Sequence, residues 1–244
     1  MENKEPERLY PMEIKIDKSK AKFSIGVYGL SHLLKEKFEG DQARDIARAE
    51  ELNQAFELFP GQQFGADFRF HLNDNLFASA GISWRRSISQ FNKIIEIKDT
   101  TFIRTDEFAG QELIVDATRT IVHHNKLTSL ILPLSLGYQT QFGKWGFGTN
   151  AGIAIHFTQH FSGRTLNSNS LLVSYPNNEN DLAPAKDIYL SYQLNPFVTY
   201  GLNSILSIQL KTEIGLHQFG KTALYDLKHH GWSTGIGLGL LYTP

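Results

Sequence analysis

The sequence predicts an all-β fold, a closed antiparallel up-and-down transmembrane β-barrel of about eight strands. Three observations predict it. Apolar and polar residues alternate with period two in eight segments, the large apolar side chains gather on one face of each segment, and short links alternate with long ones along the chain. Period-two alternation is typical of strands that bury only one face, and a run of such segments separated by turns is the pattern of a membrane barrel.

The clearest strand signals lie in five segments. Residues 64–72 place Phe64, Ala66, Phe68, Phe70 and Leu72 on one face, with Gly65, Asp67, Arg69 and His71 on the other. The same alternation recurs over residues 127–142, 145–157, 206–216 and 235–242. The segments 23–30, 76–87 and 188–202 are less regular and complete the set of eight.

The links between these segments fall into two kinds. Residues 73–75, 143–144 and 202–204 are short and rich in Asn and Gly, which tolerate the positive φ angles of hairpin turns. The other links, about 32–62, 90–126, 160–187 and 219–231, are long. Outer-membrane barrels have short periplasmic turns and long external loops. The alternation therefore places both termini on the periplasmic side.

Two of the long links carry structure of their own. Ile46, Ala49, Leu52 or Asn53, and Phe56 form an apolar stripe that predicts a helix over about residues 41–58. Residues 90–126 still alternate in part, which predicts that a membrane hairpin continues outward beyond the lipid. Ten strands are an alternative, if residues 164–187 add a hairpin through Leu171–Tyr175.

Composition excludes several classes of protein. The chain has 244 residues, a formal net charge of -1 and no cysteine, so neither a nucleic-acid-binding charge bias nor a thiol or disulfide chemistry is expected. The chain contains no run of about 18 apolar residues, so a transmembrane helix is not expected. Residues 1–22 are polar and lack the apolar run of a signal peptide, so we expect the export signal to lie outside this chain. We predict a polar periplasmic segment at 1–21 and a barrel over 22–244.

The polar face of the strands indicates what fills the barrel. It carries Gly, Ser, Asn and Gln together with ionisable residues, and eight strands enclose a space just wide enough for side chains. A soluble lipocalin-like barrel, the alternative, would place its apolar residues inside instead. We predict a lumen charge network that satisfies its own charges. Its members are Asp67, Arg69, His71, Arg85, Lys211 and Glu213.

Aromatic residues cluster near the ends of the predicted strands, which is typical of the two interfacial girdles of a membrane barrel. This predicts an integral protein of the bacterial outer membrane. The predicted girdle residues near one rim are Tyr138, Phe142, Trp145, Phe147, Tyr200 and Tyr242, and those toward the other are Trp84, Phe157 and Tyr192.

Several runs resemble the outer-membrane β-barrel domains common in Bacteroidetes, of the small PorT-like type. The resemblance covers about residues 22–244, although the final Thr243-Pro244 departs from the terminal aromatic residue often found in such strands. It implies a small non-porin barrel, which in some members is the C-terminal part of an anti-sigma-type signalling protein. The runs that carry it are 63–84, Leu132–Tyr138, Gly143–Trp145, Ala151–Ile153 and Gly235–Tyr242.

No catalytic or metal site is predicted. His160 and Ser162 have the His-x-Ser spacing of some lipid A deacylase barrels, but the strand parity predicts that they face the lumen or lie in a loop, away from lipid. His123-His124 and His229-His230 are expected to be polar loop residues. Pro133 and Pro196 must each lose a ladder hydrogen bond or lie at a bulge.

Four functions compete. The first is a non-enzymatic barrel without cofactor, whose external loops bind an envelope partner or ligand, surrounded by outer-membrane lipid and lipopolysaccharide and without nucleic acid. The others are the sensor barrel of a transenvelope signalling protein, a lipid-modifying enzyme, and a soluble lipocalin-like binding barrel.

Overall fold

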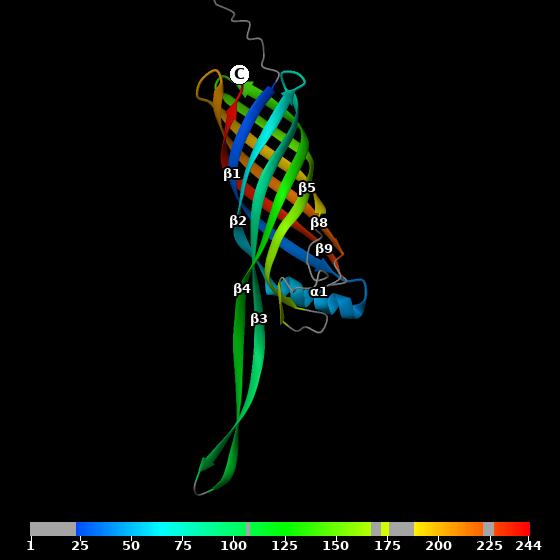
Figure 1. Ribbon diagram of the computed structural model, residues 1–244, viewed down its shortest axis with the longest axis vertical. Helices are drawn as coiled ribbons and strands as arrows, with labels where there is room; N and C mark the ends of the chain where they lie inside the picture. Colours follow the sequence, from blue (N-terminus) through cyan, green and yellow to red (C-terminus); the bar gives the residue numbers. More distant parts are fainter. Residues whose placement is uncertain (1–22, 106–107, 167–171, 176–187, 222–226) are drawn as a thin grey trace, which may run out of the picture.

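Eight antiparallel strands close into a ring in the computed structural model, in the order β1-β2-β3-β4-β5-β7-β8-β9 and back to β1 (Figure 1). The structure describes residues 23–105, 108–166, 172–175, 188–221 and 227–244. The predicted polar segment 1–21 lies outside these residues. The ring confirms the predicted up-and-down barrel.

The elements have the following bounds: β1 Phe23–Glu39, α1 Ala43–Ala55, β2 Phe56–His71, β3 Leu76–Thr105, β4 Phe108–Phe142, β5 Trp145–Leu166, β6 Leu172–Tyr175, β7 Ile188–Gly201, β8 Leu206–Lys221 and β9 Lys228–Tyr242. The strands extend the predicted segments mainly toward the long links.

The three predicted short turns lie at one end of the barrel, which we call the turn end. The side chains of Asn73 and Asn203 close two of these turns, because each Oδ1 accepts hydrogen bonds from backbone N–H groups two and three residues later. Gly143 forms the third turn with a φ of 60°. The start of β1 and the end of β9 also lie here, with Ile25 opposite Tyr242.

The long links lie at the other end, which we call the hairpin end. Strands β3 and β4 continue far beyond the ring as a two-stranded ribbon that pairs as far as Thr105 and Phe108, so the predicted outward hairpin is confirmed (Figure 1). Helix α1 lies across this end and is confirmed as a shorter helix than predicted. Among the described residues, strand β6 pairs only with the end of β5 and does not enter the ring, so the ring has eight strands and not ten.

The two faces of the barrel wall differ in chemistry. Outward side chains include Phe64, Leu136 and Leu238, which are exposed by 56%, 67% and 62%. Inward side chains along the same stretch of wall include Arg69 and Arg85, which are buried. The polar interior contradicts the lipocalin-like alternative, in which the apolar residues would lie inside. Glycine on β9 makes room for large inward side chains, because a Cβ at Gly239 would lie 3.0 Å from the Cβ of Tyr28.

Among the described residues, no helix combines the length and the apolar character needed to cross a membrane.

Both strand prolines coincide with gaps in a ladder. The β3–β4 pairing skips from Ala80–Leu134 to Ser83–Ile131, across Pro133. The β7–β8 pairing likewise has no registered pair at Pro196, although the Thr212 hydroxyl donates a hydrogen bond to the Pro196 carbonyl over 3.0 Å. The predicted loss of ladder pairing at these prolines is confirmed.

A bulge in β5 reverses the predicted direction of His160 and Ser162. Ser129 pairs with Thr158, but the preceding residue Thr128 pairs with His160, so Gln159 is an extra residue. An extra residue shifts the parity of all that follow, and cross-strand partners share a face. His160 and Ser162 therefore lie on the outward face of the strand, and the prediction that they face the lumen or lie in a loop was wrong.

Candidate functional site

The interior nearest the turn end is built around Arg69. Its guanidinium donates to Asp67 over 3.2 Å and to the Gln209 side-chain oxygen over 2.8 Å. It also lies over two rings, 5.3 Å from the centroid of Phe77 and 4.9 Å from that of Phe197. Strands β2, β3, β7 and β8 thus contribute to one packed layer. A cation held between aromatic faces and a carboxylate blocks this part of the lumen.

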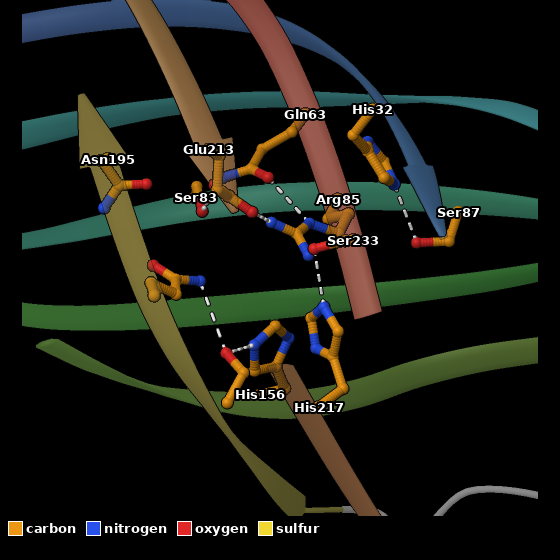
Figure 2. A network of polar contacts seen from close by, with 12 residues as sticks. His32, Gln63, Ser83, Arg85, Ser87, His156, Asn195, Glu213, His217 and Ser233 are labelled. Atoms are coloured by element: carbon orange, nitrogen blue, oxygen red, sulfur yellow. Dashed lines mark hydrogen bonds and ion pairs between the residues drawn. The ribbon is translucent and has the colours of Figure 1, made fainter. Parts of the chain in front are cut away.

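The middle of the interior holds a second ion pair. Arg85 on β3 pairs with Glu213 on β8, and its Nε donates to the Gln63 side-chain oxygen over 2.7 Å (Figure 2). Gln63 in turn donates to the Ser83 hydroxyl over 3.2 Å. The pair joins opposite arcs of the ring, because β3 and β8 are not neighbours in it.

Among the described residues, Lys211 forms no direct ion pair with either acid, although it lines the same small cavity as Asp67 and Glu213. Its ammonium nitrogen lies 3.9 Å from the centroid of the Tyr28 ring, and no ion pair to Asp67 or Glu213 forms within the described part of the chain. His71 is also outside the charged pairs, since its Nε2 shares a hydrogen bond of 2.6 Å with the Ser24 hydroxyl. The predicted network is thus two ion pairs with Lys211 and His71 beside them.

Closer to the hairpin end, imidazole–hydroxyl pairs replace the ion pairs. The nitrogen–oxygen distances are 2.8–2.9 Å (Figure 2). Two pairs join neighbouring strands, β5 with β7 and β8 with β9, whereas the third joins β1 to β3, on either side of β2. In each imidazole the other nitrogen, Nδ1, has no protein partner among the described residues. A serine nucleophile needs an oriented base and access to substrate, and these buried pairs have neither an acidic orienting group nor an opening. The pairs are His32–Ser87, His156–Ser191 and His217–Ser233.

An aromatic plug closes the hairpin end of the lumen. His229 is stacked between Phe38 and Phe219, with 4.4 Å between ring centroids on each side, and its Nε2 lies 3.1 Å from a carboxylate oxygen of Glu36. This buried position corrects the prediction that His229 is a loop residue. His230, its neighbour, is partly exposed on the opposite face.

Helix α1 covers the plug from outside the ring. Its buried residues Ala49, Leu52 and Ala55 pack in one cluster with the strand residues Phe38, Phe56 and Phe91 and with Leu227, just before β9. The predicted apolar stripe is confirmed at Ala49 and Leu52, whereas Ile46 is 47% exposed and Phe56 already belongs to β2. The helix therefore acts as a fixed lid made from the first long link.

The remaining interior space is small. Within the described part of the chain, the cavity found in the middle of the lumen has a volume of about 20 Å³ and is lined by Tyr28, Asp67, Asn195 and Lys211, among others. A volume of this size accommodates one or two water molecules. This cavity therefore fits neither a substrate nor a continuous path for ions.

The predicted girdle residues lie on the outward surface. At the turn end, the rings of Trp145 and Tyr200 lie 4.9 Å apart, and Phe142, Tyr138 and Tyr242 are exposed at the same end. Toward the hairpin end, Trp84 and Phe157 lie in one cross-strand row, whereas Tyr192 lies opposite Leu216. The sequence argument missed Trp232 on β9, which is 42% exposed and pairs with Leu216 on the neighbouring strand β8. A tryptophan near the start of the last strand was the available signal.

At the rim of the hairpin end, charges on β1 and β9 form exposed pairs. Lys37 donates to Glu39 over 2.9 Å, and Lys228 donates to Asp41 over 2.8 Å. The hydrogen bond from Lys37 lowers the pKa of Glu39, and the hydrogen bond to Asp41 raises the pKa of Lys228. His230 also lies 3.5 Å from Glu39. Lys37 and Lys228 on this side of the rim are therefore each paired with a carboxylate.

Over the residues that the structure describes, no group of three or more His, Asp or Glu side chains is arranged to hold a metal ion.

Comparison with solved structures finds similar outer-membrane barrels. Neisserial surface protein A is 8% identical, with 93% of this chain and all of that chain covered and a TM-score of 0.46. OprG of Pseudomonas aeruginosa is 12% identical, with 92% and 98% covered and a TM-score of 0.44. The Escherichia coli outer-membrane protease OmpT is 9% identical, with 93% and 98% covered and a TM-score of 0.40. No protein-family model and no curated protein matches the sequence.

Proposed function

We propose that this chain is an integral barrel of the bacterial outer membrane with a filled lumen, which acts without catalysis through its hairpin end. The observation that supports it best is the inverted wall, with large apolar side chains outside and buried ion pairs inside. Water does not favour such an outer surface, whereas lipid does. On this proposal the turn end and both termini are periplasmic, and the hairpin end is external.

The height of the apolar band supports membrane insertion. On β2 the outward apolar residues run from Phe64 to Leu72. A tilted membrane-spanning strand needs about 9–11 residues, which agrees with this run. The next outward side chain of β2 beyond Phe64 is the polar Gln62.

The hairpin end is the part of the molecule available to a partner. Beyond Phe91 on β3 and Lys126 on β4, these two strands pair only with each other among the described strands. The ribbon therefore presents two strand edges, which are ready to pair with another chain. We propose that this ribbon, together with the α1 lid, binds an envelope protein or a surface ligand.

The enzyme alternative receives one point of support from the β5 bulge. His160 and Ser162 face outward, where a lipid substrate would arrive. Their cross-strand partners, Thr128 and Lys126, supply no carboxylate that would orient the imidazole. We therefore propose a non-enzymatic barrel. The finer assignments, to the Bacteroidetes domain family and to a sensor at the end of a signalling chain, also stay proposals.

Conductance and gel mobility test the proposal together. The purified protein in detergent should migrate differently on a gel before and after boiling, as folded outer-membrane barrels do. Inserted into a planar bilayer, it should give no steady channel current, because Arg69, Phe77 and Arg85 fill the lumen. A stable open channel would contradict the filled lumen, and a protein that stays folded and soluble without detergent would contradict membrane insertion.

A further inference from the structure

On the outward surface of β2 to β5, the side chains change from apolar to polar or basic within one step along each strand. The cross-strand pairs place two successive rows there. The row nearer the turn end is Phe64, Trp84, Leu130 and Phe157, and the next row is Gln62, Arg86, Thr128 and His160. Lys126 follows one row further, opposite Ile88 and Ser162.

Three basic side chains of these rows point away from the lumen. Arg86 lies between Arg85 and Ser87, which are both buried inside the barrel. Lys126 lies between the buried residues Asn125 and Leu127. His160 is exposed and precedes Phe161, which packs against the interior clusters. Because side chains alternate along a strand, Arg86, Lys126 and His160 all lie on the outer wall.

These cations also lie close together. Arg86 and His160 flank Thr128 on either side, and Lys126 is the next outward residue on the same strand as Thr128. Diagonal neighbours of this kind are separated by about 7–8 Å at the backbone. Long Arg and Lys side chains reach across such distances, so their two charges and an N–H of the His160 ring can converge on one small anion.

No acid neutralises them within the part of the chain that the structure describes. Arg86, Lys126 and His160 form no ion pair there, whereas Lys37, Lys228 and His230 on the β9–β1 side lie against Glu39 or Asp41. The carboxylate of Glu57, which lies in the row beyond Lys126, accepts a hydrogen bond from Gln90 instead. The two sides of the same rim thus differ in charge balance.

We propose that Arg86, Lys126 and His160 form a site for the phosphate group of a membrane lipid, with the acyl chains of that lipid lying against Trp84 and Phe157. The inference rests on the proposed membrane insertion. Interfacial aromatic residues lie at the headgroup level of a bilayer, so cations one row beyond them meet lipid phosphates. Arg in particular matches phosphate geometry, because its guanidinium donates two parallel hydrogen bonds.

The apolar row beneath the cations decides between a lipid and a free anion. A soluble phosphate would gain only the charge contacts, in a position open to water. A lipid would also bury its chains beside Phe64, Trp84 and Phe157, which the barrel otherwise exposes. The site therefore fits a phosphate that carries acyl chains, such as phosphatidylglycerol or a phosphorylated glycolipid.

Fluorescence of single tryptophans tests this assignment. The chain has three tryptophans, so Trp145→Phe with Trp232→Phe leaves Trp84 beside the proposed site. The matched protein, Trp84→Phe with Trp145→Phe, leaves Trp232 on the β9–β1 side, opposite Lys35, whose ammonium donates to the Phe56 carbonyl over 3.0 Å. Each protein is inserted into two kinds of vesicle. One contains brominated phosphatidylglycerol in unlabelled phosphatidylcholine, and the other contains unlabelled phosphatidylglycerol in brominated phosphatidylcholine. Bromine quenches tryptophan on contact, so the quenching reports which lipid lies beside the tryptophan.

We expect Trp84 to be quenched several-fold more by brominated phosphatidylglycerol than its share of the bilayer predicts, and Trp232 to show no such preference. The triple variant Arg86→Gln, Lys126→Gln, His160→Gln should abolish the preference, because each full charge removed should weaken the affinity for phosphatidylglycerol roughly fivefold. The pair Lys37→Gln with Lys228→Gln should leave it unchanged. Inorganic phosphate at the headgroup concentration should not compete.

The outcomes separate this inference from the function on which it rests. Equal quenching of Trp84 by both brominated lipids would overturn the phosphate site and leave membrane insertion intact. No quenching by either lipid would overturn the insertion itself. Competition by inorganic phosphate would overturn the lipid assignment. If the triple variant does not fold, Thr128→Asp places a carboxylate between Arg86 and His160 and should remove the preference by pairing with them.

Discussion

The ion pairs inside the barrel and those at the rim between β9 and β1 use the same kinds of groups in opposite surroundings. Arg85 and Glu213 are 2% and 3% exposed, whereas Lys37 and Glu39 are 57% and 48% exposed. A buried charge that loses its partner cannot be solvated, while an exposed one returns to water. The comparison teaches that the interior pairs fix the packing of the lumen and the rim pairs only balance charge.

Breaking the Arg85–Glu213 pair should have the largest effect. Arg85→Met leaves the Glu213 carboxylate buried without its partner, and we expect the free energy of unfolding to fall by about 3–5 kcal/mol. Urea unfolding in detergent micelles, followed by tryptophan fluorescence, measures it. Combining Arg85→Met with Glu213→Leu should recover most of the loss. A double variant as unstable as the single one would show that the carboxylate is not what costs stability.

A smaller loss of stability is expected at the α1 lid, which is held by an apolar cluster and not by ion pairs. Leu52→Ala leaves a cavity among Phe38, Phe56 and Phe91 and should cost about 2–3 kcal/mol in the local stability of the lid. Limited proteolysis within residues 43–55 should become faster while the barrel keeps its heat-modifiable mobility. Ile46→Ala, at an exposed position of the same helix, is the matched control. Equal protection in both variants would mean that the lid is not held by this cluster.

The smallest effect is expected at the exposed pairs. Lys37→Gln with Lys228→Gln removes the cations beside Glu39 and Asp41, and the urea midpoint should barely move, because water replaces the lost contacts. The same unfolding assay as for Arg85→Met makes the two results comparable. A loss as large as that of Arg85→Met would erase the distinction between the two regions.

Period-two alternation and turn residues were enough to predict the ring, because both depend on neighbours in sequence. The same alternation placed Asp67, Arg69, Arg85, Lys211 and Glu213 inside. It could not tell which of them pair, because strand stagger decides that. Arg85 therefore meets Glu213 from across the lumen, while Lys211 lies over Tyr28.

Two errors have a local physical cause. One extra residue at Gln159 moves His160 and Ser162 to the outer face, and no residue type in that run marks a bulge. His229 was expected to be a polar loop residue, yet Phe38 and Phe219 stack on both sides of its ring and Glu36 accepts its hydrogen bond. These contacts join strands β1, β8 and β9 and are invisible to an argument from spacing.

The inverted wall is the central claim, and adjacent residues of β4 test it most directly. The chain contains no cysteine, so single cysteines at Leu134 and Leu136, which are 50% and 67% exposed outward, and at Ser135 between them can each be labelled with the fluorophore bimane. In vesicles of brominated lipid, we expect strong quenching at positions 134 and 136, and at 135 either no quenching or no labelling. Strong quenching at 135 with none at 134 and 136 would contradict the assignment of the two faces.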